Sequence, residues 1–262
     1  MNNQKNHQNK SLKWRLIPLQ AYSASMNMAI DEALTESVQK GGNPIIRFYQ
    51  WNPSAVSIGC FQSMNDEIDI EKCKKLRIEH VRRRTGGGAV YHDSQGEITY
   101  SIIISEKDMN VGITESYREI CGWIVNSLKL LGINSEFKPI NDIVVNNHGI
   151  IKKISGNAQT RRGGVILQHG TILYSVDINK MFSVLKVGDE KIKDKLIQNV
   201  KERVTCIKSQ SNNTKQETYQ ALVQGFLKDK EYYESKLTEQ ELMRTEQLVR
   251  ERYSRDEWNL ER

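Results

Sequence analysis

The chain of 262 residues is long enough for one large domain or two small ones, and its 38 Lys and Arg outnumber its 32 Asp and Glu. Hydrophobic residues make up 38% of the chain, and no run of about 18 apolar residues occurs, which argues against a membrane span. The basic residues are interspersed with acidic ones, so the net charge of +6 does not by itself indicate a nucleic-acid-binding face.

The first half of the chain is expected to alternate helices with strands. Residues 1–10 are mainly Asn, Gln and Lys without an apolar stretch, so we expect a disordered lead-in there and no signal peptide. From Ser25 to Val38 apolar residues recur at helical spacing, and Gly41 follows as a stop signal. The other elements expected in this half are strands at 45–49, 55–58 and 98–104, a short helix at 68–76, and a strand that ends near Arg83.

The second half begins with the strongest helix pattern, Thr114–Leu131, whose apolar positions share one face. The strands expected after it lie at 143–145, 150–154 and 165–176. Residues 208–262 are expected to be mainly helical, with capping boxes that start at Thr214 and Thr238. Because strands follow one another through short hairpins, the sequence predicts one α+β domain over residues 11–262. Its sheet is expected to be mixed, largely antiparallel and flanked by helices.

A glycine-rich stretch with arginines on one side is the strongest candidate for ligand binding. It runs Arg82-Arg83-Arg84-Thr85-Gly86-Gly87-Gly88-Ala89-Val90-Tyr91-His92-Asp93. Glycines let the backbone point N–H groups at an anion, and arginines supply bidentate donors for phosphate or carboxylate. The alternative is a flexible loop with a basic rim. The stretch matches neither a P-loop nor a Gly-x-Gly-x-x-Gly dinucleotide fingerprint.

Three further stretches carry candidate site residues, and each also has a plain structural interpretation. The pair Asn141-Asp142 opens a strand, where a carboxylate could hold Mg²⁺ beside phosphates, although an ordinary turn is the simpler interpretation. Lys153 could stabilise charge on a carboxylate–phosphate anhydride, whereas most hairpin lysines are solvated. The run His169-Gly170-Thr171 interrupts an apolar strand, so its glycine indicates close approach of a ligand or another backbone. The histidine on its own is better explained as a core residue.

The cysteines predict neither a metal site nor a disulfide framework. Cys60, Cys73, Cys121 and Cys206 lie far apart and form no Cys-x-x-Cys pair, which fits a reducing cytoplasm. No nucleophile elbow or Ser/His/Asp motif occurs either.

In their order along the chain, the motifs resemble those of the lipoate–protein ligase A family. The shared motifs are Arg-Arg-x-Thr-Gly-Gly-Gly-Ala-Val-Tyr-His-Asp, Asn-Asp-Ile, Lys-Ile-Ser-Gly-Asn-Ala and His-Gly-Thr-Ile-Leu, and the chain looks most like the short archaeal form. The resemblance implies the biotin/lipoate-ligase catalytic fold. It also implies activation of lipoate by ATP and Mg²⁺ to lipoyl-AMP. The lipoyl group would then pass to a lysine of lipoyl-acceptor domains, such as those of 2-oxoacid dehydrogenase E2 subunits and the glycine-cleavage H protein.

The resemblance also assigns roles residue by residue. Lys153 falls on the family's essential lysine, which contacts the lipoyl carboxyl end and the α-phosphate, and Asp142 falls beside the metal. The implied nucleotide contacts are Arg83, Gly88, Ala89, Val90, Tyr91, Asn141, Asp142 and Lys153. The implied lipoate contacts are Arg83, Gly87, His92, Lys153, His169, Gly170 and Thr171.

Many bacterial members continue beyond the position of Asn259 into a small accessory domain, whereas this chain ends three residues later. We therefore expect a separate small accessory protein to take part in activation, and no nucleic acid or membrane partner.

Two other functions stay open on the sequence. An octanoyltransferase of the same fold uses octanoyl-acyl-carrier protein and a cysteine placed shortly before the hairpin, and residues 136–145 contain none. A non-catalytic carrier of lipoyl-adenylate is disfavoured by the intact Lys153 and glycine stretch. An RNA-binding module is disfavoured by the lack of interleaved aromatics on a basic face. The preference between lipoate and octanoate is also open.

Overall fold

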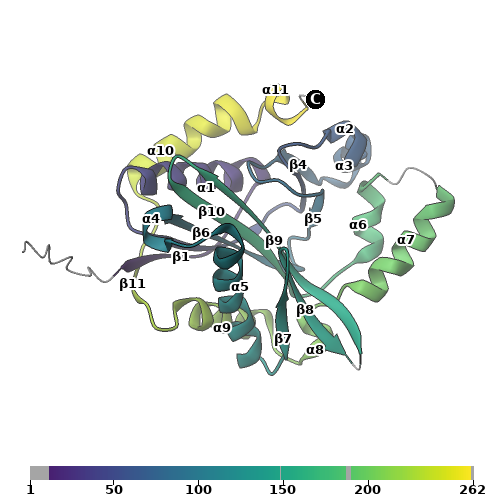
Figure 1. The fold of residues 1–262 in the computed structure, drawn as a ribbon. Helices are drawn as coiled ribbons and strands as arrows, with labels where there is room; N and C mark the ends of the chain where they lie inside the picture. The colour runs from purple at the N-terminus through teal and green to yellow at the C-terminus, as the bar shows by residue number, and fades with distance from the viewer. Residues whose placement is uncertain (1–11, 148, 187–189, 261–262) are drawn as a thin grey trace, which may run out of the picture.

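The computed structural model describes residues 12–147, 149–186 and 190–260, and it confirms the predicted mixed α+β architecture. One large sheet runs through the centre with helices against it (Figure 1), in the strand order β11-β1-β2-β6-β10-β9-β8-β7. Its strands are β1 (Lys13–Tyr22), β2 (Ile45–Trp51), β6 (Glu97–Ser105), β7 (Ser135–Lys138), β8 (Asp142–Asn147), β9 (Ile150–Arg162), β10 (Val165–Leu173) and β11 (Glu231–Glu234). The lead-in expected at residues 1–10 lies outside the described residues.

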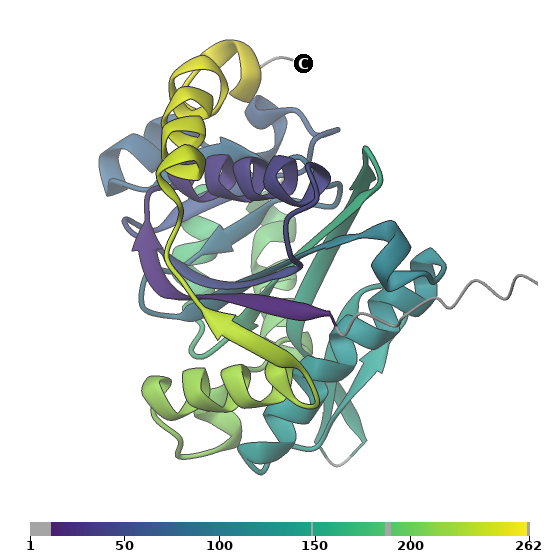
Figure 2. The same ribbon diagram turned by 90° about the vertical axis from the view of Figure 1, so that its left-hand side faces the viewer.

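Most neighbouring strands of this sheet are antiparallel, as the hairpin pattern predicts. The strands from β2 through β6, β10, β9 and β8 to β7 all pair in this way. β1 is the exception, because it pairs in parallel with both β2 and β11 (Figure 2). The sequence pattern predicts neither β1 nor β11. β1 contains Pro18 and an irregular register between Ile17 and Gln20, and β11 is a four-residue strand in an otherwise helical region.

A second, smaller sheet carries the glycine-rich stretch. Its order is β4 (Glu79–Arg82), β3 (Ala55–Ile58), β5 (Val90–His92). The glycines form the loop between β4 and β5, and both of these strands pair with β3. Both ends of the loop are therefore fixed by the same central strand.

Helices cover the large sheet. α5 (Ile113–Leu130) and α9 (Lys215–Leu227) pack against each other and enclose an aromatic core around Phe226. α1 (Ala24–Gln39) and α10 (Glu239–Leu248) form a second helix pair (Figures 1 and 2). The remaining helices are α2 (Met64–Glu67), α3 (Ile70–Leu76), α4 (Glu106–Met109), α6 (Ile178–Val184), α7 (Glu190–Arg203), α8 (Ile207–Gln210), the π-helical turn η1 (Val249–Tyr253) and α11 (Asp256–Asn259). No helix in the described residues is long and apolar enough to cross a membrane.

Local signals explain several of these boundaries. Thr214 and Thr238 begin α9 and α10 with the predicted capping boxes, in which each threonine and the glutamate three residues later satisfy each other's backbone N–H. The strand expected at 165–176 ends earlier, at Leu173. The chain leaves the sheet there because the N–H groups of Tyr174 and Ser175 both donate to the Gly96 carbonyl, at 2.9 Å each.

Candidate functional site

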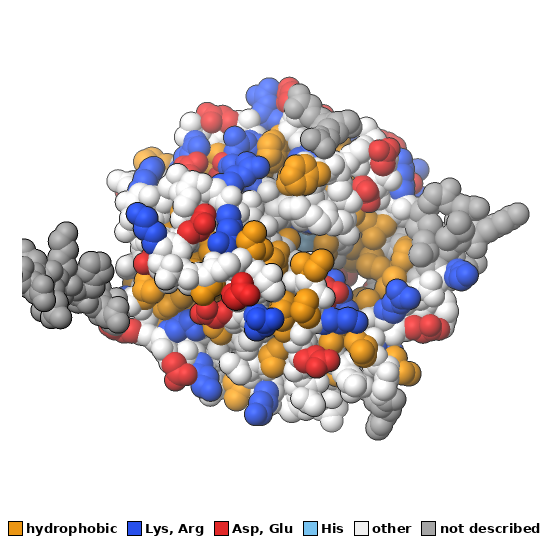
Figure 3. Space-filling view, in the orientation of Figure 1, with side chains coloured by type: hydrophobic (Ala, Val, Ile, Leu, Met, Phe, Trp, Pro, Cys, Tyr) orange, Lys and Arg blue, Asp and Glu red, His pale blue; other side chains and the backbone are white. Residues whose placement is uncertain are grey.

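A cavity of about 480 Å³ lies between the small sheet, strands β9 and β10, and helix α6. Figure 3 shows hydrophobic side chains around a hollow on this face of the molecule. The predicted site residues that line the cavity are Arg83, Gly87, Gly88, Ala89, Val90, Tyr91, His92, Asn141, Lys153, His169, Gly170 and Thr171. Asp142 reaches it only through its contact with Lys153. The four stretches singled out in the sequence therefore meet at one place.

Arg83 holds the glycine loop in shape from within. Its Nη2 donates to the carbonyl oxygens of Gly86 and Gly88, at 2.8 Å each, and its Nη1 donates to the Ser57 carbonyl at 3.0 Å. The residue is only 5% exposed, and burial lowers the pKa of Arg83 to about 10, so it stays charged at neutral pH. No carboxylate in the described part of the chain pairs with it directly. Its guanidinium donors all bond to the protein, so none of them is left for a ligand. Arg83 can influence a ligand only through its charge and by holding the loop in shape.

The loop turns its carbonyls inward and leaves its N–H groups available. Within the described residues, the amides of Gly86, Gly87, Gly88 and Ala89 donate to no protein acceptor. Gly87 has a φ of +98°, which other residues rarely adopt, and a Cβ on Gly59 would lie 2.1 Å from the Gly87 oxygen. The loop is thus packed against the end of β3, which argues against the flexible-loop alternative. Consecutive free amides beside a buried cation form an anion-binding concavity.

Two hydrogen-bond chains connect Arg83 to buried carboxylates, and the first runs through His92. Arg83 Nη1 donates to Ser57 Oγ at 3.2 Å, Ser57 Oγ lies 2.8 Å from His92 Nε2, and His92 Nδ1 lies 2.7 Å from Glu97 Oε1. The Trp51 ring stacks on the imidazole, with centroids 4.0 Å apart. Both ring nitrogens of His92 are engaged inside the protein, so neither is free to donate to a ligand.

The second chain runs through His169. Arg83 Nε donates to Thr85 Oγ1 at 3.1 Å, Thr85 Oγ1 lies 2.8 Å from His169 Nε2, and His169 Nδ1 lies 3.2 Å from Asp31 Oδ2. Burial lowers the pKa of His169 and its bond to Asp31 offsets only part of this, so the ring is neutral at neutral pH. Burial alone raises the pKa of Asp31, but Arg47, at 2.7 Å, and His169 bring it below its ordinary value. His169 is therefore both a satisfied core histidine and part of the cavity wall.

Gly170 makes room for a side chain of the protein and not for a ligand at that point. A Cβ on Gly170 would lie 2.1 Å from Asn157 Oδ1, which accepts from the Tyr100 hydroxyl at 2.7 Å. Asn157 Nδ2 donates to the Asn141 carbonyl at 2.8 Å, and Asn141 Nδ2 donates to the Asn157 carbonyl at 2.6 Å. This reciprocal pair fixes Asn141 at the edge of the cavity.

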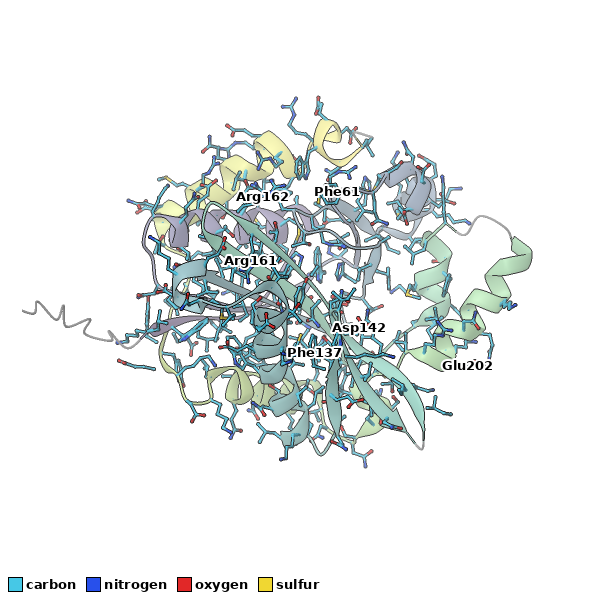
Figure 4. The ribbon with its side chains drawn as sticks, viewed as in Figure 1. Phe61, Phe137, Asp142, Arg161, Arg162 and Glu202 are labelled. Atoms are coloured by element: carbon cyan, nitrogen blue, oxygen red, sulfur yellow. The ribbon has the colours of Figure 1, made fainter. Side chains whose placement is uncertain are left out.

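Lys153 and Asp142 form an ion pair where the cavity meets the β8–β9 hairpin. Lys153 Nζ lies 2.6 Å from Asp142 Oδ1, and the two side chains are 40% and 34% exposed. Figure 4 places Asp142 near the centre of the face on which the cavity opens. A Cβ on Gly156 would lie 2.7 Å from Lys153 Nζ. The glycine at position 156 therefore leaves space for the Lys153 side chain.

Residues 23–227 match the family described as the lipoyl protein ligase A/B catalytic domain. The chain belongs to this family. The octanoyltransferase LipM of Brevibacillus brevis is 36% identical, over 95% of this chain and 99% of that protein. A solved chain of the bipartite lipoate–protein ligase system of Thermoplasma acidophilum superimposes with a TM-score of 0.87 and 36% identity, covering 95% of this chain and 96% of that one. A lipoate–protein ligase A structure with bound ATP gives 0.81 and 33%, covering 95% and 98%.

Membership of the lipoyl protein ligase A/B family confirms the resemblance inferred from the motifs, and it makes the chain an enzyme of lipoyl or octanoyl transfer. The relatives include proteins named as lipoate–protein ligases, one of them solved with bound ATP, and proteins named as octanoyltransferases, so the reaction within the family has to be argued from the site.

The site of this family member does not fit a metal held by the protein alone. The residues described contain no group of three or more His, Cys, Asp or Glu side chains that could hold an ion. Asp142 is a single half-exposed carboxylate that is already paired with Lys153. Mg²⁺ keeps several waters and needs only one or two carboxylates besides substrate phosphates. The geometry therefore fits Mg²⁺ that arrives on a nucleotide.

Sequence reasoning missed the apolar walls of the cavity. Met28 of α1 and Tyr49 and Trp51 of β2 form the inner wall, and Met181 and Phe182 of α6 form part of another. Tyr49 and Trp51 are two residues apart, so they share one face of the strand. That alternation is visible in the sequence, but which face of β2 meets the cavity depends on the order of strands in the sheet.

None of the four cysteines lines the cavity. Burial raises the pKa of Cys73 to about 11 and of Cys121 to about 12, and Cys206 is buried as well. Cys60 is half-buried behind the glycine loop, where its N–H donates to the Thr85 carbonyl at 2.9 Å. No thiol therefore stands where it could attack an acyl group in the cavity.

Proposed function

We propose that this enzyme joins lipoate to AMP with ATP and then transfers the lipoyl group to a lysine of an acceptor domain. The observation that carries the proposal is the glycine loop, whose amides from Gly86 to Ala89 have no protein acceptor among the described residues and lie next to the buried Arg83. Such a concavity suits a phosphate. Lys153 lines the same cavity and suits the point where carboxylate and phosphate meet.

The apolar walls suit the tail of the acid. Met28, Tyr49 and Trp51 offer a hydrocarbon-lined recess next to the charged loop, so a fatty-acid-like chain would lie there with its carboxylate toward Lys153. His92, His169 and Thr171 add polar side chains to the lining of the same cavity. We assign the nucleotide to the side of Gly88, Ala89, Val90 and Tyr91, as the family resemblance implies.

In the first step, a carboxylate oxygen of lipoate attacks the α-phosphorus of ATP, the bond to the β-phosphate oxygen breaks, and pyrophosphate leaves. Lys153 would exchange its partner Asp142 for the negative charge that develops between the reactants, which lowers the barrier electrostatically. Holding both reactants in one cavity supplies proximity and keeps water from the anhydride. Mg²⁺ carried by ATP would supply further charge neutralisation, with Asp142 as its nearest protein carboxylate.

In the second step, the acceptor lysine amine attacks the acyl carbon, the bond to the AMP oxygen breaks, and the amine proton passes to solvent. This route needs no enzyme thiol, which agrees with a cavity that no cysteine lines. We propose lipoyl domains of E2 subunits or an H protein as acceptors, with the cytoplasm as the compartment. We also expect a separate accessory chain in activation, since the related T. acidophilum ligase is described as bipartite.

The test is an incubation of the purified chain with ATP, Mg²⁺, lipoate and a lipoyl-domain acceptor, read by intact mass of the acceptor. The proposal expects the purified chain to transfer from synthetic lipoyl-AMP without ATP, and to lipoylate the acceptor from lipoate and ATP once an accessory chain is added. An acceptor that stays unmodified with lipoyl-AMP would refute it.

The relative named octanoyltransferase supports a second candidate, transfer of an octanoyl group from octanoyl-acyl-carrier protein. That reaction needs a nucleophile, and Cys60 is the half-buried cysteine whose N–H bonds to the Thr85 carbonyl beside the glycine loop. Octanoylation of the acceptor without ATP, lost on Cys60→Ala in a folded protein, would favour this candidate over the ligase. A Cys60→Ala variant that keeps full ATP-dependent lipoylation is expected.

A further inference from the structure

The arginines on either side of Arg83 make contacts that the proposed reaction does not use. Arg83 lines the cavity, whereas Arg82, at the end of β4, and Arg84 do not. Arg82 is 3% exposed and the Arg84 side chain is 26% exposed. Arg82 bonds directly to the C-terminal segment, residues 249–260, and Arg84 connects to it through Glu32 of α1.

Arg82 is bonded to α11 by its backbone and its side chain. Its N–H donates to Asn259 Oδ1 at 2.9 Å, its Nε donates to the Trp258 carbonyl at 2.9 Å, and its Nη2 donates to the Asn259 carbonyl at 3.1 Å. Trp258 Nε1 donates back to the Arg82 carbonyl at 2.9 Å. The end of β4 is thereby joined to the end of the described chain.

Arg84 is bonded to the same segment through one buried carboxylate, Glu32 of α1. Glu32 Oε1 accepts from both Arg84 and Arg252, and Glu32 Oε2 accepts from the Tyr253 hydroxyl at 2.7 Å. Glu32 is 5% exposed. Burial and the adjacent Glu32 hold the pKa of Tyr253 well above its ordinary value, so the phenol remains a donor. Glu32 therefore joins the arginine at the start of the glycine loop to η1.

Helix α10, which leads into this segment, is itself held firmly against the rest of the protein. On α10, Glu241 pairs with Arg15 at 2.6 Å in a buried contact, and Arg244 pairs with Glu36 at 2.8 Å. Leu248 and Tyr253 belong to the same hydrophobic cluster as three residues of the inner cavity wall, namely Met28, Tyr49 and Trp51.

We propose that Glu32 is a positioning residue for ligand binding, and that Arg252 and Tyr253 act through it to hold Arg84 and so fix the glycine loop. Arg84 lies between Arg83, from which both hydrogen-bond chains start, and Thr85, the next member of the chain to His169. Without its bond to Glu32, Arg84 would no longer restrain the backbone on either side of it. The backbone of the glycine loop would then be more mobile, and its amides would no longer be held in one arrangement. The proposal rests on the proposed function only for the identity of the ligand.

The test compares two arginine variants of the full chain. Arg252→Ala removes a partner of Glu32. Arg244→Ala removes a matched arginine–carboxylate pair between α10 and α1, and within the described residues its partner Glu36 makes no hydrogen bond to Arg84 or the glycine loop. The ligand is a sulfamoyl analogue of lipoyl-AMP, titrated by calorimetry. We expect Arg252→Ala to weaken binding about tenfold and Arg244→Ala to change it by less than about twofold, although both lower the melting temperature. Arg252→Lys should regain most of the affinity.

A second measurement keeps the outcome independent of the ligand. Hydrogen exchange of the peptide that contains residues 84–89 should speed up in Arg252→Ala and not in Arg244→Ala. Equal affinity and exchange in Arg252→Ala and wild type, or equal losses in both variants, would overturn the positioning role. A wild-type chain that does not bind the analogue would count against the proposed function instead, and the exchange comparison would still decide the role of Glu32.

Discussion

The two charged ends of the cavity differ in how completely they are built before a ligand binds. At the glycine loop, Arg83 is buried, and its donors bond to Thr85, Ser57 and two loop carbonyls. At the hairpin, Lys153 is 40% exposed and makes an ion pair with one half-exposed carboxylate, Asp142. A preorganised group binds charge without rearrangement, whereas a loosely held one can change partner during reaction. The difference indicates that the glycine loop defines where the anion binds, whereas Lys153 can change its partner as charge develops during the reaction.

The largest expected effect is on rate, at the loosely held end. Replacing Lys153 by Ala should lower the rate of acyl transfer by roughly 10² to 10³, as is typical for removal of one charged donor to a transition state. The fold should be unaffected, because the side chain is half-exposed. Lys152→Ala is the matched control, since Lys152 is its neighbour on β9, is half-buried like it, and makes only a long hydrogen bond to the Lys201 carbonyl, at 3.4 Å. A Lys153→Ala enzyme within about threefold of wild type would remove this lysine from the mechanism.

At the preorganised end, substitution should affect stability as well as binding. Arg83→Lys keeps the charge but loses the planar fork that bonds Gly86, Gly88 and Ser57, so buried carbonyls lose partners. We expect a loss of about 1–3 kcal/mol in the free energy of unfolding, measured by urea titration, together with weaker binding of the lipoyl-AMP analogue. Unchanged stability would show that the loop does not depend on this side chain, and the contrast between the two ends would disappear.

Asp142 should have a smaller effect than Lys153, because it contacts the reactants only through the lysine or a nucleotide-borne ion. We expect Asp142→Asn to lower the rate of lipoyl-AMP formation by about tenfold or less. Its transfer from preformed lipoyl-AMP should change less. A rise in the Mg²⁺ concentration needed for half-maximal activation would identify it as a metal ligand, and an unchanged Mg²⁺ dependence would restrict it to orienting Lys153.

The smallest effect concerns pH and the chain through His169. Burial holds the pKa of His169 below the ordinary 6.5, so on acidification the unfolded state takes up a proton before the folded state does. Stability should therefore fall as the pH drops below about 6.5. His169→Gln should make the melting temperature less dependent on pH in this range, even though it lowers the value. His80, whose pKa burial also lowers, accounts for a further part of the slope. Parallel curves for His169→Gln and wild type would contradict the prediction.

Much of the site was accessible from local sequence because its parts are continuous motifs. The arginine–glycine stretch, the pair Asn141-Asp142, Lys153 and the run His169-Gly170-Thr171 were each recognisable, and all meet at the cavity or beside it. Their roles toward ATP and lipoate stay predictions.

What the sequence did not reveal depends on contacts between distant segments. Ser57 and Glu97 carry no motif, and only the pairing of β3 with β5 brings Ser57 beside His92. Likewise, Gly170 correctly indicated a close approach, but the approaching group is the side chain of Asn157 and no local pattern identifies it. In the fold, β1 was not predicted because its proline and charged residues are not typical of a buried strand. Its pairing partner β11 is distant in the sequence, so only the tertiary structure reveals the strand.

The position of β1 has a consequence for how the protein is made. Its residues 13–16 pair in parallel with β11, more than two hundred residues later in the chain (Figure 2). During synthesis at roughly 5–20 residues per second, that edge of β1 waits for tens of seconds before its neighbour leaves the ribosome. An unpaired strand edge is a template for association with other chains. In a nascent chain, this edge of β1 therefore stays open to association with other chains until β11 has been made.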